Sequence, residues 1–240
     1  MEHENKSGYV HSIDTSGMVD GPGIRYLIFL SGCGLKCKYC HNPDTWKKRS
    51  GRLMTVDEII QDIEKYRSYL RFSGGGVTVS GGDPFFQPQF LEELLAGCKA
   101  AGFHTAIDTS GYAPGHVVER VLKHTDLLLL DIKSINPMTF EAVTGVPIDR
   151  TLETLRISQR MRVKAWVRFV LVPGLTDDLD DMRKLARFLK PFDNIEKVDV
   201  APFHKTGEYK WRDLEQEYEL WDTPPPSAEL MEAAKGILTW

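Results

Sequence analysis

The sequence alternates short apolar runs, rich in β-branched residues, with longer stretches that repeat at the period of an α-helix. The runs with the length and composition of strands are residues 25–31, 76–80, 104–108, 126–131, 164–171 and 195–201. The stretches with helical spacing are residues 55–70, 87–101, 115–123, 137–144, 151–161, 177–189 and 227–238. Strands that alternate with helices favour a parallel sheet in which a helix connects each strand to the next.

The number of strands indicates how this sheet is arranged. The run Leu127-Leu128-Leu129-Leu130 is apolar without interruption, which is typical of a strand covered on both faces. Six strands are too few for the closed barrel of eight units. We therefore predict an α/β fold, an open partial TIM barrel of the (β/α)6 type with outer helices. It forms a single domain, residues 1–240, that includes a short N-terminal extension and a C-terminal helix.

Composition excludes several classes of function. The 42% hydrophobic content suffices for a core, and the net charge of -4 argues against nucleic-acid binding. The short basic run Lys47-Lys48-Arg49 is typical of a solvated loop. The polar start of the chain does not resemble a signal peptide, and no apolar run approaches the ~20 residues of a membrane span. We expect a cytoplasmic protein that does not bind membranes.

Polar and sulfur-containing residues follow or lie within the predicted strands. In parallel barrels, functional groups gather at the carboxyl ends of the strands. Side chains from all six strands should therefore share one site. The residues concerned are Cys33, Gly82, Asp83, Asp108, Thr109, Asp131, Lys133, Arg168 and His204.

Three of the four cysteines lie close together, with the spacing C-x3-C-x2-C at Cys33, Cys37 and Cys40. Three thiolates can ligate three irons of a [4Fe-4S] cluster and leave the fourth iron open, as catalytic metal sites require. The alternative is structural zinc, which needs four ligands. His41 is the nearest further ligand, and its position directly after Cys40 is sterically awkward. Cys98 lies in a helical stretch and should be a buried apolar residue.

The cysteine loop, with the aromatic Tyr39 before its last cysteine, resembles the signature of the radical S-adenosylmethionine superfamily. Further stretches resemble, in the same order, the activating enzymes of glycyl-radical enzymes, and among them the pyruvate formate-lyase branch. These stretches are residues 16–25, 40–46, 73–82, 104–111, 130–133, 166–168, 172–174 and 202–204. Related activators often insert a cysteine-rich segment after the first motif, and this sequence lacks one. The resemblance makes residues 1–240 a radical S-adenosylmethionine core domain.

The resemblance also implies a reaction. The open iron of a [4Fe-4S] cluster would chelate the amino and carboxylate groups of S-adenosylmethionine. Reductive cleavage would give a 5'-deoxyadenosyl radical, which removes a hydrogen from a glycine of the partner, pyruvate formate-lyase. A flavodoxin or ferredoxin would donate the electron, and we expect the activase to be a monomer.

The same resemblance assigns roles to individual residues. The catalytic cluster ligands would be Cys33, Cys37 and Cys40. The contacts to S-adenosylmethionine would be Tyr39, Cys40, His41, Gly82, Asp83, Asp131, Ile132, Lys133, Arg168 and His204. A monovalent cation, Na+ or K+, would lie at Asp108, Thr109 and Asp131. This sequence has Asp83 where the family usually has Glu, which shortens that side chain by one methylene.

Two other classes of function stay open at this point. A radical enzyme that acts on a small molecule would carry the same cysteine loop, although the short barrel offers no obvious lid over such a substrate. A non-enzymatic electron-transfer or zinc module would need a fourth ligand close to the loop, and none is evident. Formation of 5'-deoxyadenosine separates the enzymes from the module, and a glycyl radical on the partner separates the two enzymes.

Overall fold

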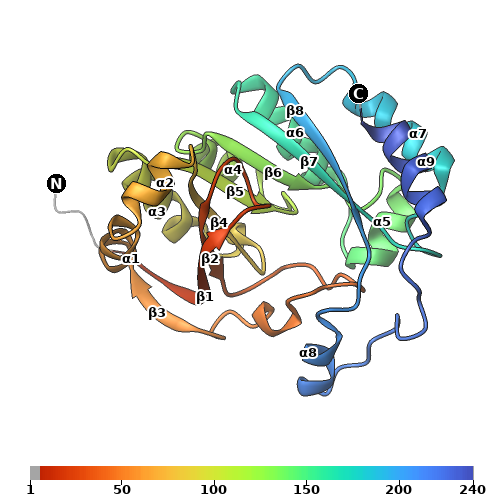
Figure 1. Ribbon diagram of the computed structural model, residues 1–240, viewed down its shortest axis with the longest axis horizontal. Coiled ribbons are helices and arrows are strands. Elements are labelled where there is room, and N and C mark those ends of the chain that lie inside the picture. Colours follow the sequence, from red (N-terminus) through yellow and green to blue (C-terminus); the bar gives the residue numbers. More distant parts are fainter. Residues whose placement is uncertain (1–5, 240) are drawn as a thin grey trace.

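The structure is a computed structural model that describes residues 6–239. Its described strands form one sheet in the order β3-β1-β2-β4-β5-β6-β7-β8 (Figure 1). The strands are β1 (Ser7–Gly17), β2 (Arg25–Leu30), β3 (Arg52–Thr55), β4 (Gly76–Gly81), β5 (His104–Thr109), β6 (Leu127–Asp131), β7 (Lys164–Leu171) and β8 (Ile195–Pro202). The helices are α1 (Val56–Glu64), α2 (Arg67–Phe72), α3 (Pro88–Ala100), α4 (Gly115–Leu122), α5 (Pro137–Thr144), α6 (Asp149–Arg160), α7 (Leu179–Leu189), α8 (Glu208–Asp213) and α9 (Ala228–Leu238).

The predicted open barrel is confirmed. Strands β2, β4, β5, β6, β7 and β8 pair in parallel and in sequence order. Each begins and ends within about a residue of its predicted bounds, and β7 matches them at both ends. The sheet curves with helices on its outer side, and in the described residues β3 and β8 end it without pairing with each other (Figure 1). The one-domain prediction over residues 1–240 stays a prediction.

Two antiparallel strands at one edge were not predicted. Strand β1 pairs with both β2 and β3, so it extends the parallel sheet by two strands. Most of β1 is polar and only partly buried, and β3 has four residues, so neither shows the apolar run that marks the other strands. Their burial comes from neighbours that are distant in the sequence, which local patterns do not report.

The helices follow local signals closely. The Thr55 hydroxyl accepts from the Glu58 backbone N–H at 3.2 Å, and the Glu58 carboxylate accepts from the Thr55 N–H at 2.7 Å. This capping box begins α1 as its sequence predicts. The stretch predicted as one helix over 55–70 is broken at Lys65 and Tyr66, so that α2 is separate. Helix α8 and the 3-10 turns Pro43–Thr45 and Pro84–Phe86 are further elements that the sequence did not reveal.

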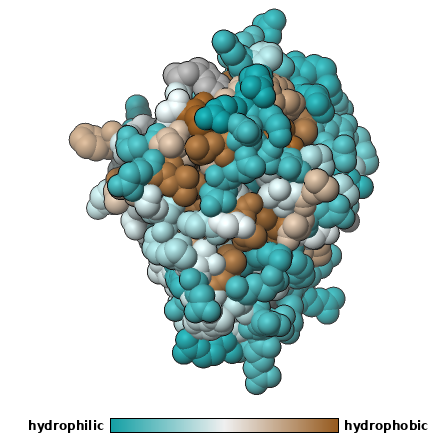
Figure 2. All heavy atoms as spheres, turned by 90° about the vertical axis from the view of Figure 1, so that its right-hand side faces the viewer, coloured by the Kyte–Doolittle hydropathy of each residue, from teal (hydrophilic) through white to brown (hydrophobic). Residues whose placement is uncertain are grey.

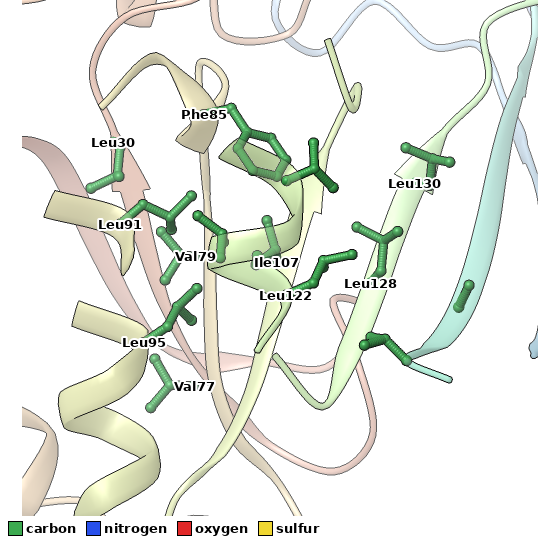
Figure 3. Close-up of a cluster of buried hydrophobic side chains, with 14 of the residues drawn as sticks. Leu30, Val77, Val79, Phe85, Leu91, Leu95, Ile107, Leu122, Leu128 and Leu130 are labelled. Carbon is green, nitrogen blue, oxygen red and sulfur yellow. The ribbon is translucent and has the colours of Figure 1, made fainter. Parts of the chain in front are cut away.

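The core lies between the outer face of the sheet and the helices that cover it. Figure 3 shows side chains of β4, β5 and β6, such as Val79, Ile107 and Leu128, packed near Leu91 and Leu95 of α3 and Leu122 of α4. Each fully buried side chain of this kind contributes about 1.5–3 kcal/mol. Cys98 is fully buried in the same cluster, which confirms its predicted role.

Side chains alternate between this core and the inside of the barrel. Val167 and Phe169 of β7 belong to the core, whereas Arg168 lines a cavity inside the barrel. The same period of two turns Leu128 and Leu130 toward the helices and Asp131 toward the inside. Because successive side chains of a strand point to opposite faces, the polar residues of these buried strands point into the interior of the barrel.

The surface is largely polar. The face shown in Figure 2 is mostly hydrophilic, with hydrophobic residues gathered in small areas. No described helix is both long and apolar enough to span a bilayer.

Candidate active site

A cavity of about 600 Å³ opens at the carboxyl ends of the parallel strands. Nearly all of the predicted site residues line it, which brings together groups from all six strands. They are Cys33, Cys37, Tyr39, Cys40, His41, Gly82, Asp83, Asp108, Thr109, Asp131, Lys133, Arg168 and His204. Ile132 is the exception among the predicted contacts, because its side chain is fully buried in the hydrophobic core.

Strand register explains the charged inner wall of the cavity. Asp131 lies opposite Arg168 in the β6–β7 pair, and Arg168 lies opposite Asp199 in the β7–β8 pair. Side chains at paired positions share one face of the sheet. The wall therefore alternates acidic and basic groups across three neighbouring strands.

The cysteine loop between β2 and β3 is tied to the fold by its backbone. Lys36 N donates to Thr144 O at 2.9 Å and Lys38 N donates to Val143 O at 3.0 Å, so the loop is fastened to the end of α5. Gly82 N donates to Leu30 O at 2.9 Å, and a Cβ on Gly82 would lie 2.3 Å from Gly32 O. A side chain at position 82 would thus separate the loop from the end of β4.

The three thiols share a poorly solvated wall of the cavity. Burial raises the pKa of Cys37 to about 12, and burial also raises the pKa of Cys33 and Cys40. Hydrogen bonds from the Asn42 backbone and the Trp46 side chain lower the pKa of Cys40 and so oppose the effect of burial. Thiols in such surroundings ionise when a cation binds them, which suits iron ligation.

The thiols do not converge as a zinc site would require. Within residues 6–239, no three His, Cys, Asp or Glu side chains are grouped around a single ion position. A structural zinc ion needs four ligands at about 2.0–2.3 Å from one point. A [4Fe-4S] cluster takes each thiolate on a different iron, so its ligands stand further apart. Three thiols on one loop that line one cavity match the three cysteine ligands of a cluster with one open iron.

Asp83 is locked in place by neighbouring donors. Its Oδ1 accepts from Phe85 N at 3.0 Å and Thr109 Oγ1 at 2.9 Å, and its Oδ2 accepts from Ser110 N at 3.0 Å. The Ser110 hydroxyl donates to Oδ2 as well. Burial raises the pKa of this carboxyl, and the hydrogen bonds oppose that shift. Asp83 thus joins the ends of β4 and β5 beneath the cysteine loop.

Lys133 and Asp131 form an ion pair on the cavity wall. Lys133 Nζ lies 2.6 Å from Asp131 Oδ2. Burial lowers the pKa of Lys133, but nearby anionic groups, Asp131 first among them, and the hydrogen bond to Asp131 together raise the pKa overall, so the ammonium stays charged. Within the described residues, the buried atoms Asp131 Oδ1 and Tyr39 Oη have no hydrogen-bond partner. Buried polar atoms of this kind generally need a partner, which a ligand or cation can supply.

Arg168 and Asp108 make a second charged group. Arg168 Nη1 lies 3.4 Å from Asp108 Oδ1, and Arg168 Nη2 lies 3.5 Å from Asp20 Oδ1. Burial raises the pKa of Asp108 to about 6, although the Arg168 charge opposes that shift. Ser80 Oγ donates to Asp108 Oδ2 at 2.8 Å.

Two histidines stack where the cysteine loop meets the segment after β8. The rings of His41 and His204 are 4.2 Å apart, and His41 Nε2 lies 2.9 Å from His204 O. Both histidines line the cavity, and their predicted contacts to S-adenosylmethionine stay predictions. Asn42, which also lines the cavity, accepts from Lys210 Nζ through its Oδ1 at 2.9 Å.

Several groups that complete the site were not singled out from the sequence. Asp20 lies in the stretch 16–25, to which the resemblance assigns no role for this residue, and Ser80 lies two positions before Gly82, on the same face of the chain. Ser110 directly follows the predicted site residue Thr109. Trp211 and Lys210 reach the cysteine loop from about 170 positions away, and no local signal reveals such a contact.

Comparison with known proteins agrees with this geometry. An open barrel of six parallel strands, with three cysteines in the loop after its first parallel strand, defines the radical S-adenosylmethionine class of enzymes. Residues 27–189 match the radical SAM superfamily, and the chain belongs to it.

Within that superfamily, the chain belongs to the pyruvate formate-lyase-activating enzymes. It is 40% identical to pyruvate formate-lyase 1-activating enzyme of Escherichia coli strain K12, over 96% of this chain and 95% of that protein. It is 46% identical to pyruvate formate-lyase-activating enzyme of Staphylococcus aureus strain USA300, over 95% of this chain and 93% of that protein.

Solved structures show the same fold. A domain of pyruvate-formate lyase-activating enzyme from Bacteroides vulgatus ATCC 8482 superposes with a TM-score of 0.58 at 27% identity, over 68% of this chain and 92% of that one. Streptococcus suis SuiB bound to precursor peptide SuiA superposes with a TM-score of 0.64 at 18% identity, over 83% of this chain and 42% of that one. The second likeness concerns the fold alone.

Proposed function

We propose that this protein generates the glycyl radical of pyruvate formate-lyase. A cluster held by Cys33, Cys37 and Cys40 would cleave S-adenosylmethionine reductively, and the resulting radical would take a hydrogen from a glycine of the partner. The observation that carries the proposal is that all three thiols line the same cavity as Lys133 and Asp131, in a chain related to activating enzymes over nearly its whole length.

The chain's own residues hold and shield the substrate. When bound, the cluster supplies the electron that breaks the C5'–S bond, which leaves methionine and a 5'-deoxyadenosyl radical. The Lys133 ammonium, fixed by Asp131, is placed to bind the methionine carboxylate. Tyr39, Cys40, His41 and His204, which line the same cavity, would contact the nucleoside. The buried walls exclude water from a radical that would otherwise be quenched.

Asp83 would contribute by position as well as by charge. Its two oxygens already accept from Phe85, Thr109 and Ser110, which nearly fills the capacity of a carboxylate. We propose that it holds the Thr109–Ser110 turn against Gly82. The predicted contact to the ligand's amino group, like the contacts predicted for Ile132 and Arg168, stays a prediction.

A monovalent cation, Na+ or K+, suits the oxygens around Asp131. Asp131 Oδ1 is buried without a partner among the described residues, and Asp108 and Thr109 line the same cavity. Carboxylate and hydroxyl oxygens are the ligands that hard cations prefer. Such an ion would offset part of the acidic charge beside the bound substrate.

The partners follow from the proposed reaction. The glycine-bearing segment of pyruvate formate-lyase would enter the open side of the barrel, and a flavodoxin or ferredoxin would supply the electron. The four cysteines are free thiols, which suits the reducing cytoplasm. We propose that the activase works there as a monomer.

Anaerobic reconstitution tests the proposal. The chain is loaded with iron and sulfide, reduced, and mixed with S-adenosylmethionine and pyruvate formate-lyase. We expect 5'-deoxyadenosine together with a glycyl radical detected by electron paramagnetic resonance. A cluster that yields 5'-deoxyadenosine but no glycyl radical would assign the chain to small-molecule radical chemistry. An intact, reduced cluster that yields neither would overturn both enzymatic interpretations.

A further inference from the structure

The segment that follows β8 contacts the cysteine loop through side chains that lie outside the cavity. Trp211 Nε1, on α8, donates to the backbone oxygen of Cys40 at 2.9 Å. Lys210 Nζ, the preceding residue, lies 2.9 Å from Asn42 Oδ1 and 3.0 Å from Asp44 Oδ2. The two neighbouring side chains therefore bind the third cysteine and the turn directly after it.

The contacts between this segment and the cysteine loop are close and partly shielded from water. A Cβ on Gly207, just before α8, would lie 2.7 Å from the Cα of His41, so the two backbones pack directly. The Trp211 side chain is buried and meets the Trp46 ring edge-on, with ring centroids 5.1 Å apart. Tyr218 covers the other side of Trp211 at 5.2 Å, and Tyr39 belongs to the same hydrophobic cluster.

Hydrogen bonds and ion pairs around a metal ligand usually decide how it is presented. Removal of such outer partners typically costs about 10–100-fold in metal affinity. The backbone of the loop is also tied at other points: Gly32 N donates to Thr45 O at 2.6 Å, Cys40 N donates to Cys37 O within the loop at 3.0 Å, and Lys36 and Lys38 bond to the end of α5. Trp211 and Lys210 reach Cys40 and the turn behind it from α8, and His11 of β1 also reaches that turn, with its Nε2 3.2 Å from Asp44 Oδ2.

We propose that Trp211 and Lys210 are positioning residues for Cys40, which fix residues 40–44 so that the third thiol is set for cluster ligation. Neither side chain lines the cavity, so they act through the cysteine loop and not on the substrate. The inference rests on the cluster assignment of the proposed function. It adds that the stability and potential of the cluster depend on a helix outside the barrel.

The test compares matched substitutions in the reconstituted full-length protein. Trp211→Phe removes the indole N–H and keeps most of the ring, whereas Trp221→Phe makes the same change on a ring that packs against Tyr218 and Arg212. The readouts are the rate at which excess chelator bleaches the cluster and the midpoint potential of the cluster without S-adenosylmethionine. We expect about tenfold faster loss and a shifted potential for Trp211→Phe. We expect neither change for Trp221→Phe.

Other results would overturn the inference. Equal chelator rates and potentials in the wild type and Trp211→Phe would show that the contact does not position Cys40. Equal acceleration in both Phe variants would show general loosening of the segment. If Trp211→Phe does not fold, Lys210→Met with Arg212→Met as its control carries the same test and the same expectations. A wild-type chain that takes up no cluster would overturn the proposed function itself.

Discussion

At the residue scale, the site depends on groups held by several partners at once. Asp83 joins two strand ends through Phe85, Thr109 and Ser110, and Asp131 pairs with Lys133 while one of its oxygens stays without a partner in the described residues. A carboxylate whose oxygens accept several hydrogen bonds, like that of Asp83, is typical of a structural role. A buried oxygen without a partner, like that of Asp131, is typical of a ligand-binding role. The two aspartates should therefore respond differently to substitution.

Cys37→Ala should abolish cluster assembly, because two thiolates cannot hold the cube that three would ligate. We expect iron and sulfide contents near the blank after reconstitution, and no 5'-deoxyadenosine. Cys98→Ala is the matched control, since Cys98 is fully buried in the core away from the cavity. That variant should keep its cluster. A Cys37→Ala protein that retains iron and activity would contradict the assignment of the loop.

Asp83→Ala should destabilise the fold by about 3 kcal/mol, because it leaves buried donors of Phe85, Thr109 and Ser110 without an acceptor. Asp83→Asn keeps the size and one acceptor oxygen, so a smaller loss is expected. Urea unfolding of the cluster-free chain measures both. A loss below about 0.5 kcal/mol for Asp83→Ala, ordinary for a surface position, would argue against this network.

At the scale of elements, the parallel strands were predictable and the edge of the sheet was not. Runs such as Leu127 to Leu130 are apolar because both faces of the strand are covered, so the local sequence itself indicates a buried strand. Strand β1 gains its place by pairing with β2 and β3, and helix α8 by contacts with the distant cysteine loop, whereas the sequences of both elements mix polar and apolar residues. Local patterns do not report contacts between distant segments. The cysteines and the residues at strand ends were therefore predictable as site residues, whereas Trp211 was not.

Asp126 ties three elements together and gives a pH-dependent prediction. Asp126 lies directly before β6. Its Oδ2 accepts from Thr105 N of β5 at 2.9 Å, and its Oδ1 accepts from Lys99 Nζ of α3 at 2.9 Å. Burial alone raises the pKa of Asp126, but these bonds lower it overall below 3.8. A lowered carboxyl pKa stabilises the fold above the unfolded value of 3.8, and this stability is lost as the pH falls through the folded pKa.

Asp126→Asn should therefore be less stable than the wild type at pH 7, with a difference that narrows as the pH drops below 3.8. Urea unfolding of both proteins between about pH 7 and pH 3 measures the difference in free energy. A gap that stays constant or widens toward low pH would show that Asp126 does not act through its charge.

At the scale of the whole molecule, the fold builds one deep site beneath an open side. The strand ends, the cysteine loop and the segment after β8 meet around a single cavity, while the sheet ends at β3 and β8 without closing in the described residues (Figure 1). Val19, which is 72% exposed, also lines the cavity, so the cavity wall reaches the surface at that residue. The proposed function needs such an opening, because a nucleoside and a chain segment of the partner would both have to reach the cavity.

The proposed function requires that the radical made in this cavity takes its hydrogen from a glycine of pyruvate formate-lyase. The most direct measurement uses partner protein labelled with deuterium at the glycine α-carbon, with the reduced activase and S-adenosylmethionine, and mass spectrometry of the nucleoside product. We predict 5'-deoxyadenosine that carries one deuterium, formed together with the glycyl radical. Unlabelled 5'-deoxyadenosine formed beside a full glycyl-radical signal would contradict direct hydrogen transfer.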